Sequence, residues 1–253
     1  VCSSDLGETP KHRASTFLVD GTLAIDAGAV TRGLDLDRQG ALEACLVSHA
    51  HLDHVRDLAT LADNRCQMRS PPLTVAGSRA TIESLRKHFF NGVLWPDFSV
   101  IPSGVAGRST IEFLELEYEK PTDVAGRLVQ AIPVSHTIDC AGFLIESDGR
   151  ALAYSGDTGP TDRLWEVLEK AANLRAMLIE VSFPDREAGL ARVSGHYTPA
   201  SLEADLKKFS RAASTPTFLY HIKPLYQREV ETECANLKGL SLEVPELDDV
   251  YQV

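Results

Sequence analysis

The feature that most constrains this chain is a cluster of imidazole and carboxylate side chains directly after a short apolar segment. Residues Ala44–Val47 are apolar, which is typical of a buried strand, and they are followed at once by Ser-His-Ala-His-Leu-Asp-His. In extended backbone His49 and His51 point to the same side, because side chains alternate along a strand. If a helix follows at residues 55–59, the Asp-His pair lies at its first turn. Neutral imidazoles and carboxylates suit zinc, iron and manganese, so this segment predicts a metal site rather than a solvated polar loop.

The same arrangement recurs along the chain: a predicted strand ends, and a side chain able to bind a metal stands just beyond it. The later examples follow the apolar segments 128–134, 151–154, 176–179 and 217–220, and they are His136, Asp157, Glu180 and His221. A single histidine is more often structural than a ligand, but loops at one rim of a rigid scaffold are where sites are normally built. The repetition therefore predicts one shared site. His12 and His88 lack this context, so we expect them to be surface or packing residues.

The order of the predicted elements indicates an α/β protein. Residues 16–19 and 23–25 are predicted strands joined by an Asp-Gly turn, which is a strong hairpin signal. Strands and helices then follow in turn, with a helix predicted at residues 198–210. The chain has no repeats and no linker-like segment, so residues 1–253 are predicted to form a single domain. Within it, residues 1–6 are expected to be a foreign or truncated end in place of a first strand.

Composition excludes several classes of protein. The net charge of −11 argues against a broad nucleic-acid surface, because phosphate binding needs clustered lysine and arginine, whereas a small anionic substrate stays compatible. No apolar run approaches the length of a membrane span, and no secretory signal peptide opens the chain. The five cysteines are scattered, odd in number and without a Cys-x-x-Cys pair, so we expect reduced thiols in a cytoplasmic protein.

The motif His-x-His-x-Asp-His after an apolar strand resembles the signature of the metallo-β-lactamase superfamily of binuclear metal hydrolases. The stretch from His49 to Val55, together with Trp95-Pro96-Asp97-Phe98, is similar to the class II cyclic-nucleotide phosphodiesterases of that superfamily. The resemblance covers about residues 16–223. It implies the fold of the superfamily, a four-layer αββα sandwich.

The resemblance also implies a ligand set. One metal would be held by His49, His51 and His136, the other by Asp53, His54 and His221, and Asp157 would bridge the two. The implied cofactors are two divalent metal ions, with zinc as the first expectation and manganese or iron(II) as alternatives. Asp53 would also be a catalytic residue. The bridging position carries an oxygen ligand here, where some β-lactam-cleaving members carry a cysteine.

The function implied is hydrolysis of 3′,5′-cyclic nucleotides such as cyclic AMP to the 5′-monophosphate, with a hydroxide shared by the two metals as nucleophile. Glu180 and His196 resemble a Glu-then-His pair of ribonuclease Z, a related branch, in which the histidine is placed to protonate a departing ribose oxygen. The alternative for His196 is a structural role at the start of the helix that follows it.

Three other functions stay open at the level of sequence. They are a ribonuclease Z-like nuclease, a hydrolase of esters, lactones or β-lactams, and a metal-binding regulatory protein without turnover. The nuclease depends on a basic arm, and the chain has neither a Gly- and Lys-rich insertion nor a basic net charge. The complete ligand set disfavours the regulatory protein. We therefore expect a small phosphodiester as partner, no extended nucleic acid and no membrane, and we leave a homodimer open.

The sequence leaves the roles of three further positions open. Asp26, after the second predicted strand, either supports the metal site or forms a turn before glycine. The aromatic segment 90–98 either packs in the core or walls a pocket for a purine ring. Lys223 either contacts a phosphate oxygen or lies in solvent.

Overall fold

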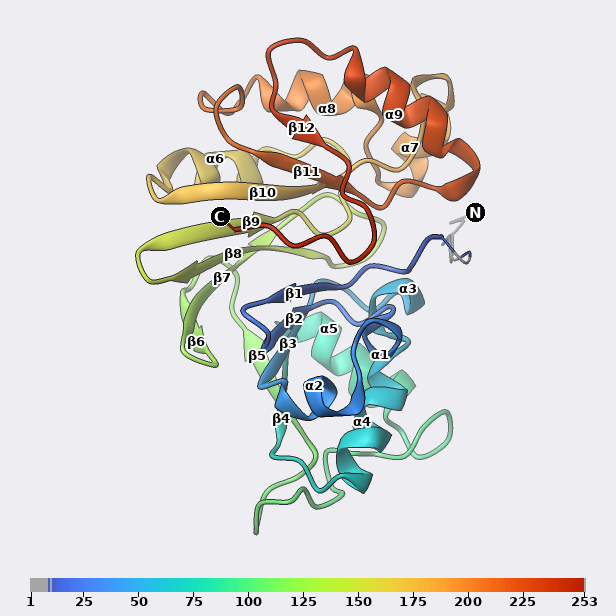
Figure 1. Ribbon diagram of the computed structural model, residues 1–253, viewed down its shortest axis with the longest axis vertical. Helices are drawn as coiled ribbons and strands as arrows, with labels where there is room; N and C mark the ends of the chain where they lie inside the picture. Colours follow the sequence, from blue (N-terminus) through green and yellow to red (C-terminus); the bar gives the residue numbers. More distant parts are fainter. Residues whose placement is uncertain (1–8, 10, 253) are drawn as a thin grey trace.

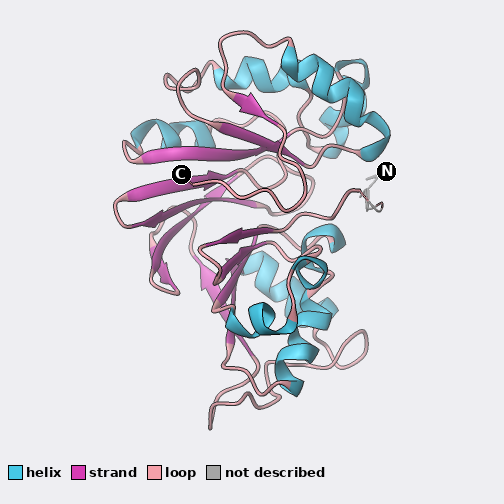
Figure 2. Ribbon diagram, viewed as in Figure 1, coloured by secondary structure: helices cyan, strands magenta, loops and turns pink. Residues whose placement is uncertain are grey.

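Two β-sheets pack against each other in this protein, and helices cover the outer face of each sheet (Figures 1 and 2). The computed structural model describes Thr9 and residues 11–252. The expectation for residues 1–6 lies outside this range. Among the described residues, no helix has the length and apolar character needed to cross a membrane.

The first sheet has five strands in the order β1-β2-β3-β4-β5. Its first pair is the antiparallel hairpin that the Asp-Gly turn predicts, and the remaining pairs are parallel. The strands are β1 (Phe17–Val19), β2 (Leu23–Ile25), β3 (Ala44–Val47), β4 (Leu73–Ser78) and β5 (Ile111–Leu116). The helices of this half are α1 (Val30–Gly33), α2 (Leu36–Ala41), α3 (Leu52–Val55), α4 (Leu58–Gln67), α5 (Arg79–Ser84) and the π-helical η1 (Leu85–Phe89).

The second sheet has seven strands in the order β12-β11-β10-β9-β8-β7-β6. They are β6 (Thr122–Val124), β7 (Arg127–Pro133), β8 (Ala141–Ser147), β9 (Arg150–Tyr154), β10 (Leu174–Glu180), β11 (Thr217–Tyr220) and β12 (Leu242–Glu243). The helices of this half are α6 (Arg163–Lys170), α7 (Ala188–Ser194), α8 (Pro199–Leu206) and α9 (Gln227–Ala235), with short 3₁₀ turns η2 (Asp185–Glu187) and η3 (Pro224–Tyr226). The short strand β6 and the helix α7 are elements that the sequence patterns did not predict.

The core divides by strand face, as a sandwich requires. In β3, Ala44 and Leu46 lie in the cluster between the sheets, whereas Cys45 and Val47 lie in the cluster under the helices of the first half. A third cluster joins the outer face of the second sheet to α6, α8 and α9. Strands buried on both faces read as continuous apolar runs, which is why β3 shows no alternation in the sequence. These clusters give the four-layer αββα arrangement that the resemblance implied.

Two predicted helix boundaries were wrong. The helix after the motif begins at Leu52 and breaks before α4, because Ala27 N–H bonds to the His54 carbonyl and Asp57 N–H bonds to the Ala27 carbonyl. The segment after β2 thus takes backbone groups that a continuous helix would use. Helix α8 ends at Leu206 and not near residue 210, because the chain tightens into turns there.

The carboxyl ends of six strands meet at one rim. Strands β2 and β3 are parallel in the first sheet, and β9, β10 and β11 are parallel in the second. Strand β7 shares the direction of β9, since both are antiparallel to β8. The residues just past these six ends therefore come from both sheets and lie where the two sheets meet.

Candidate metal centre

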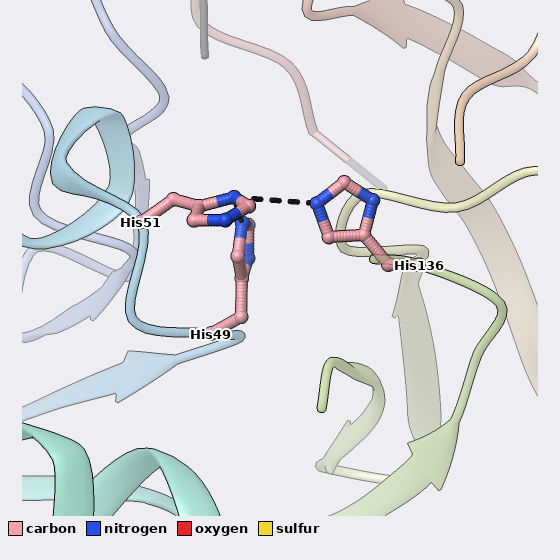
Figure 3. Close-up of side chains that lie close together, drawn as sticks. All are labelled: His49, His51 and His136. Atoms are coloured by element: carbon pink, nitrogen blue, oxygen red, sulfur yellow. Dashed lines mark hydrogen bonds between the residues drawn. The ribbon is translucent and has the colours of Figure 1, made fainter. Parts of the chain in front are cut away.

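Three histidines form the first group of converging side chains (Figure 3). Two of them follow β3, and His136 follows β7. Nδ1 of His51 lies 3.0 Å from Nε2 of His49 and 3.3 Å from Nε2 of His136. The structure thus brings together the first predicted ligand set.

The surroundings of these rings orient their lone pairs toward one another. Nδ1 of His136 donates to the Gly195 carbonyl at 3.0 Å, and Nδ1 of His49 lies 3.0 Å from the Ser48 hydroxyl. The Ser48 hydroxyl donates to Asp26, so it accepts from His49, and both histidines then carry the ring proton on Nδ1 and leave Nε2 without one. Burial lowers the pKa of His49, His51 and His136, so the rings are neutral at neutral pH. Neutral rings with converging nitrogen atoms are the state in which imidazole binds a metal.

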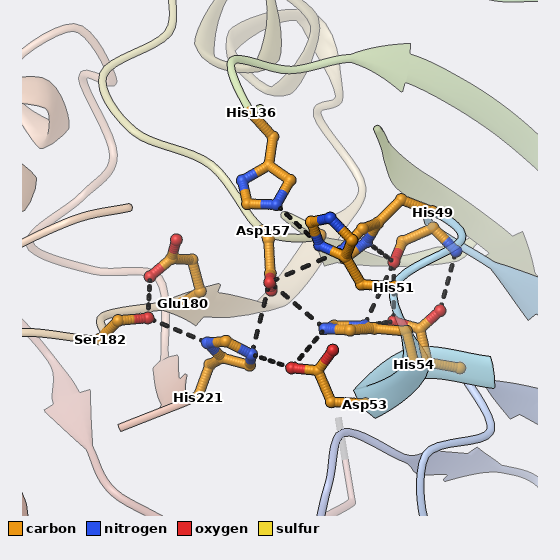
Figure 4. Close-up of polar contacts among 12 residues, drawn as sticks. His49, His51, Asp53, His54, His136, Asp157, Glu180, Ser182 and His221 are labelled. Atoms are coloured by element: carbon orange, nitrogen blue, oxygen red, sulfur yellow. Dashed lines mark hydrogen bonds and ion pairs between the residues drawn. The ribbon is translucent and has the colours of Figure 1, made fainter. Parts of the chain in front are cut away.

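Asp53, His54, Asp157 and His221 form the second group (Figure 4). Oδ2 of Asp157 lies 3.3 Å from Nε2 of His54 and 3.3 Å from Nε2 of His221. Oδ2 of Asp53 lies 3.3 Å from Nε2 of His221. The side chains of Asp53, His54 and Asp157 are almost completely buried, and that of His221 is 7% exposed, so the four face one another more than solvent.

Asp157 links the two groups, because its Oδ2 also lies 3.8 Å from Nε2 of His49 in the first group. Three atoms in the second group are buried without a hydrogen-bond partner: Oδ1 of Asp53, Nε2 of His54 and Oδ1 of Asp157. Buried polar atoms are normally satisfied, so these orphaned atoms call for a ligand. Oxygen and imidazole donors with this clustering fit divalent metals.

The carboxylates set the protonation of the second group. Burial favours the neutral ring of His54, but the charges of Asp157 and Asp26 outweigh burial and raise its pKa well above the ordinary value. Burial alone would raise the pKa of Asp53, but the hydrogen bond from His221 and the charge of His54 hold it below the usual range. A metal binds the neutral ring, so metal binding and protonation compete at Nε2 of His54.

Asp26 supports the site from beneath and does not merely form a turn. Its side chain is completely buried, and Oδ2 accepts hydrogen bonds from His54, Tyr154 and Ser48. Its backbone is left-handed, with φ of 56°. Aspartate tolerates this conformation better than most residues do, which allows the carboxylate to point back under the motif.

Glu180 and His196 lie beside both groups as a hydrogen-bonded pair. Nδ1 of His196 lies 2.7 Å from Oε1 of Glu180, and the Ser182 hydroxyl contacts both residues as well as Nδ1 of His221. Burial raises the pKa of Glu180 to about 8 and lowers the pKa of His196 to about 4. Both shifts favour an uncharged pair, with Glu180 protonated and the His196 ring neutral. The side chain that caps α8 is Thr198, so His196 does not cap the helix.

Some residues of the site carried no signal in the sequence. Ser182, Tyr154 and Gly195 hold predicted site residues in place, yet each reaches its partner only through the fold. A serine two residues after a strand-end glutamate is too common to single out. Lys223 is buried, so the solvent alternative for it was wrong.

Other predicted residues lie apart from the site. His12 contacts Thr9, and His88 is exposed, as expected for residues outside the site. In the aromatic segment, Phe90 and Phe98 belong to the core, whereas Trp95 is partly exposed and donates its indole N–H to the Ala59 carbonyl. The core alternative is right for the two phenylalanines, and the purine wall stays a prediction for the exposed part. The four cysteines that the structure describes form no disulfide.

Comparison with known proteins places this fold and site in a family. The Beta-lactamase superfamily domain matches residues 16–222. A probable 3′,5′-cyclic-nucleotide phosphodiesterase of Yersinia pestis is 29% identical over 249 residues, covering 81% of this chain and 71% of that protein. A ribonuclease Z of Bradyrhizobium diazoefficiens is 26% identical over 239 residues, covering 72% of this chain and 74% of that protein. The crystal structure of the metallo-beta-lactamase fold protein YhfI from Bacillus subtilis superposes with a TM-score of 0.72 at 16% identity, covering 94% and 90% of the two chains.

The chain belongs to the beta-lactamase superfamily, because the family domain spans most of it. It has the metallo-β-lactamase fold and is a metal-dependent hydrolase.

Proposed function

We propose that this protein is a binuclear phosphodiesterase that hydrolyses 3′,5′-cyclic nucleotides to 5′-monophosphates. The observation that carries the proposal is the arrangement around Asp157. One carboxylate oxygen of Asp157 lies within 3.3 to 3.8 Å of histidines from both groups, and a Glu–His pair stands beside them. A phosphodiester needs both parts: a charged centre that holds the phosphate and a group that protonates the leaving oxygen.

The seven side chains of the two groups would hold two zinc ions, with Asp157 shared between them; manganese and iron(II) are the alternatives. Bound divalent metals supply a nucleophilic water at neutral pH and neutralise charge on the phosphoryl group. The protein's own contribution is to fix the ligands before the metal arrives. Asp26, Ser48, Ser182 and the Gly195 carbonyl do so by hydrogen bonds to the ligand rings.

Within this proposal, the protonated carboxyl group of Glu180 donates to Nδ1 of His196, and the neutral ring carries its own proton on Nε2. His196 passes that proton to the departing ribose oxygen, while Glu180 orients the ring. The contact between Oε1 of Glu180 and Nδ1 of His196 leaves Nε2 of the ring to face the substrate. Histidine in such a position is the commonest general acid in enzymes. The ring of His196 also packs against those of His136 and His221, with centroids 5.0 and 5.3 Å away, so it borders both metal groups.

The choice of a cyclic nucleotide rests on the relative from Yersinia pestis and on charge. That relative is named a probable 3′,5′-cyclic-nucleotide phosphodiesterase. The net charge of −11 is unfavourable for a long nucleic acid and acceptable for a small substrate with a single phosphodiester.

A panel of substrates tests the proposal. Metal-loaded protein would be assayed with cyclic AMP, cyclic GMP, bis(p-nitrophenyl) phosphate, a lactone and a β-lactam, with added zinc or manganese and with a chelator. We expect turnover of the phosphodiesters that requires metal, and Asp157→Ala should lower both the metal content and the rate. Hydrolysis of the lactone or β-lactam without any phosphodiester would reject the proposal.

Ribonuclease Z-like cleavage is the second candidate, favoured by the relative of that name from Bradyrhizobium diazoefficiens. A precursor tRNA with a 3′ trailer belongs in the same panel. Cleavage of the trailer at a rate above that of cyclic AMP would replace the first proposal with this one.

A further inference from the structure

Lys223 is a buried lysine beside the metal centre. It follows β11 by three residues and is only 3% exposed. Its backbone N–H bonds to the Ser182 carbonyl, and its Nζ lies 5.9 Å from the centroid of the Phe183 ring. Within residues 11–252, Nζ makes no hydrogen bond and no ion pair. The side chain therefore carries a positive charge into the protein without an anionic partner.

The other buried cations of the described chain each donate several hydrogen bonds, although Nε of each has no partner. Arg65 donates to the carbonyl groups of Gln39, Gly40 and Pro71. Arg127 bonds to Asp20, to Thr22 and to the Ala125 carbonyl. Among the described residues, Lys223 differs from both arginines because its ammonium makes a ring contact and no hydrogen bond, so Nζ can donate to a ligand that enters the site.

The side chain of Lys223 lies near His196, with one aromatic ring between them. Phe183, on which the ammonium rests, packs its ring 5.8 Å from the ring of His196. Burial is the main cause of the lowered pKa of His196 and of His221; Asp157 opposes it, and the charge of Lys223 adds to it. The ammonium is thus close enough to act on the Glu–His pair and on the second metal group.

We propose that Lys223 is the anion-binding residue of this site and that its Nζ donates a hydrogen bond to a non-bridging phosphate oxygen of the substrate. This inference rests on the proposed function in that it takes the substrate to be a phosphodiester. Without substrate, the face of Phe183 holds the ammonium by a cation–π contact. With substrate, the phosphate supplies the missing counter-charge, and a charge-assisted hydrogen bond forms.

Inorganic phosphate is the probe that tests the proposal independently of turnover. Phosphate would be titrated by calorimetry into metal-loaded wild type and into Lys223→Met, Lys223→Arg and Lys207→Met. We expect Lys223→Met to bind phosphate about 10- to 100-fold more weakly and Lys223→Arg to stay within a few-fold of wild type. Lys207 is exposed after the last residue of α8, so Lys207→Met removes the same charge and should change little.

The melting temperature of the metal-free protein separates binding from a structural role. Methionine has a similar length and no charge, so Lys223→Met should melt at or above the wild-type temperature. If Lys223→Met does not fold, Lys223→Gln takes its place in both measurements. A folded, metal-loaded variant that binds phosphate as tightly as wild type would overturn the inference, and so would a wild type that binds no phosphate. Loss of affinity in the variant, with no phosphodiester hydrolysed by wild type, would instead overturn the proposed function alone.

Discussion

Nδ1 of His54 lies 2.6 Å from Oδ2 of Asp26, although 28 residues separate the two in the sequence. The contact fixes the ring proton on Nδ1, so Nε2 of His54 faces Asp157 at 3.3 Å. The same Asp26 oxygen accepts from the Tyr154 hydroxyl at 2.5 Å, which ties the end of β2 in one sheet to the end of β9 in the other. One carboxylate thus orients a metal-binding ring and joins the two sheets beneath it.

Replacement of Asp26 should weaken metal binding while preserving the fold. Asparagine tolerates the left-handed backbone of this position, but its amide is a weaker acceptor for the ring of His54. Outer partners of metal ligands typically contribute 10- to 100-fold to affinity, so we expect Asp26→Asn to lose about that much for zinc. Competition with a chromogenic chelator measures it. Asp63→Asn, at a half-buried aspartate of α4 that contacts Gln67, is the control, and an equal loss in both variants would contradict the role of Asp26.

Removal of the metal should destabilise the folded protein. The predicted ligands come from strand ends in both sheets, so a metal bound there stabilises the folded state by mass action. At a metal concentration 100 times the dissociation constant, the expected gain is about 2.7 kcal/mol per site. A chelator should lower the melting temperature, and zinc should restore it. An unchanged melting curve after verified metal removal would exclude a site that links the sheets.

Gly195 should resist substitution because of its place under His136. Its backbone is left-handed, with φ of 71°, and an added Cβ would lie 3.0 Å from Cα and 3.1 Å from Nδ1 of His136. Gly195→Ala should therefore displace the His136 ring and lower the metal content. Gly189→Ala is the matched control: it lies in α7, an added Cβ there meets nothing within 4 Å, and alanine favours helix. Full metal content in Gly195→Ala would show that the ring position does not depend on this glycine.

The ends of the strands could be predicted from sequence because buried strands are short apolar segments bounded by polar residues. Strand β3 ends at Val47, two residues before His49, and β11 ends at Tyr220, directly before His221, so the position of each ligand relative to its strand could be predicted. That both ends lie at one rim followed from the parallel sheets of the fold, which the resemblance supplied. The seven metal-binding candidates are therefore brought together as predicted.

Contacts between distant segments could not be predicted. Gly28 shows the reason: an added Cβ would lie 1.9 Å from the Asp53 carbonyl oxygen, so the segment after β2 packs directly on the motif helix. That packing also interrupts the helix between α3 and α4. The pairing of Asp26 with His54 depends on the same approach. Contacts of this kind arise from packing between distant segments, and they produce no periodic pattern of residues in the sequence.

Asp205 should make stability depend on pH. Its buried carboxylate accepts from Tyr197 at 2.6 Å, from Trp165 at 2.9 Å and from Lys208 at 2.6 Å. Burial would raise the pKa of Asp205, but the donors, Lys208 first, outweigh burial and lower it below 3.8. The folded state therefore binds fewer protons than the unfolded state near this pH, so the contribution to stability is present above pH 3.8 and is lost as the pH falls through the lowered value.

Asp205→Asn should cost about 1–3 kcal/mol of unfolding free energy at pH 7, and the difference from wild type should shrink toward pH 3. Urea unfolding in the presence of a chelator measures it without a contribution from metal. Asp162→Asn is the control, since Asp162 pairs with the same lysine through an exposed carboxylate that is worth little. A pH-independent difference for Asp205→Asn would show that the charge of the carboxylate is not what stabilises the contact with Tyr197.

The role proposed for His196 predicts a dependence on the leaving group. General acid catalysis contributes about 10²–10⁴-fold, and less where the leaving group departs without a proton. His196→Ala should therefore slow cyclic AMP hydrolysis strongly and spare bis(p-nitrophenyl) phosphate, whose nitrophenolate leaves unaided. Glu180→Gln should show a milder form of the same bias, because Glu180 only orients the ring through its contact at 2.7 Å.

A metal ligand should behave differently, and this difference makes the test decisive. His49→Ala removes a completely buried ring whose Nε2 lies 3.0 Å from His51, so it should lower metal content and slow both substrates together. His196 lies beside the two groups, and its loss should leave metal content unchanged. Rates for both substrates, with metal measured in every variant, therefore separate the roles. Equal losses on both substrates in His196→Ala at full metal content would assign the residue to substrate positioning. The leaving oxygen would then be protonated by solvent.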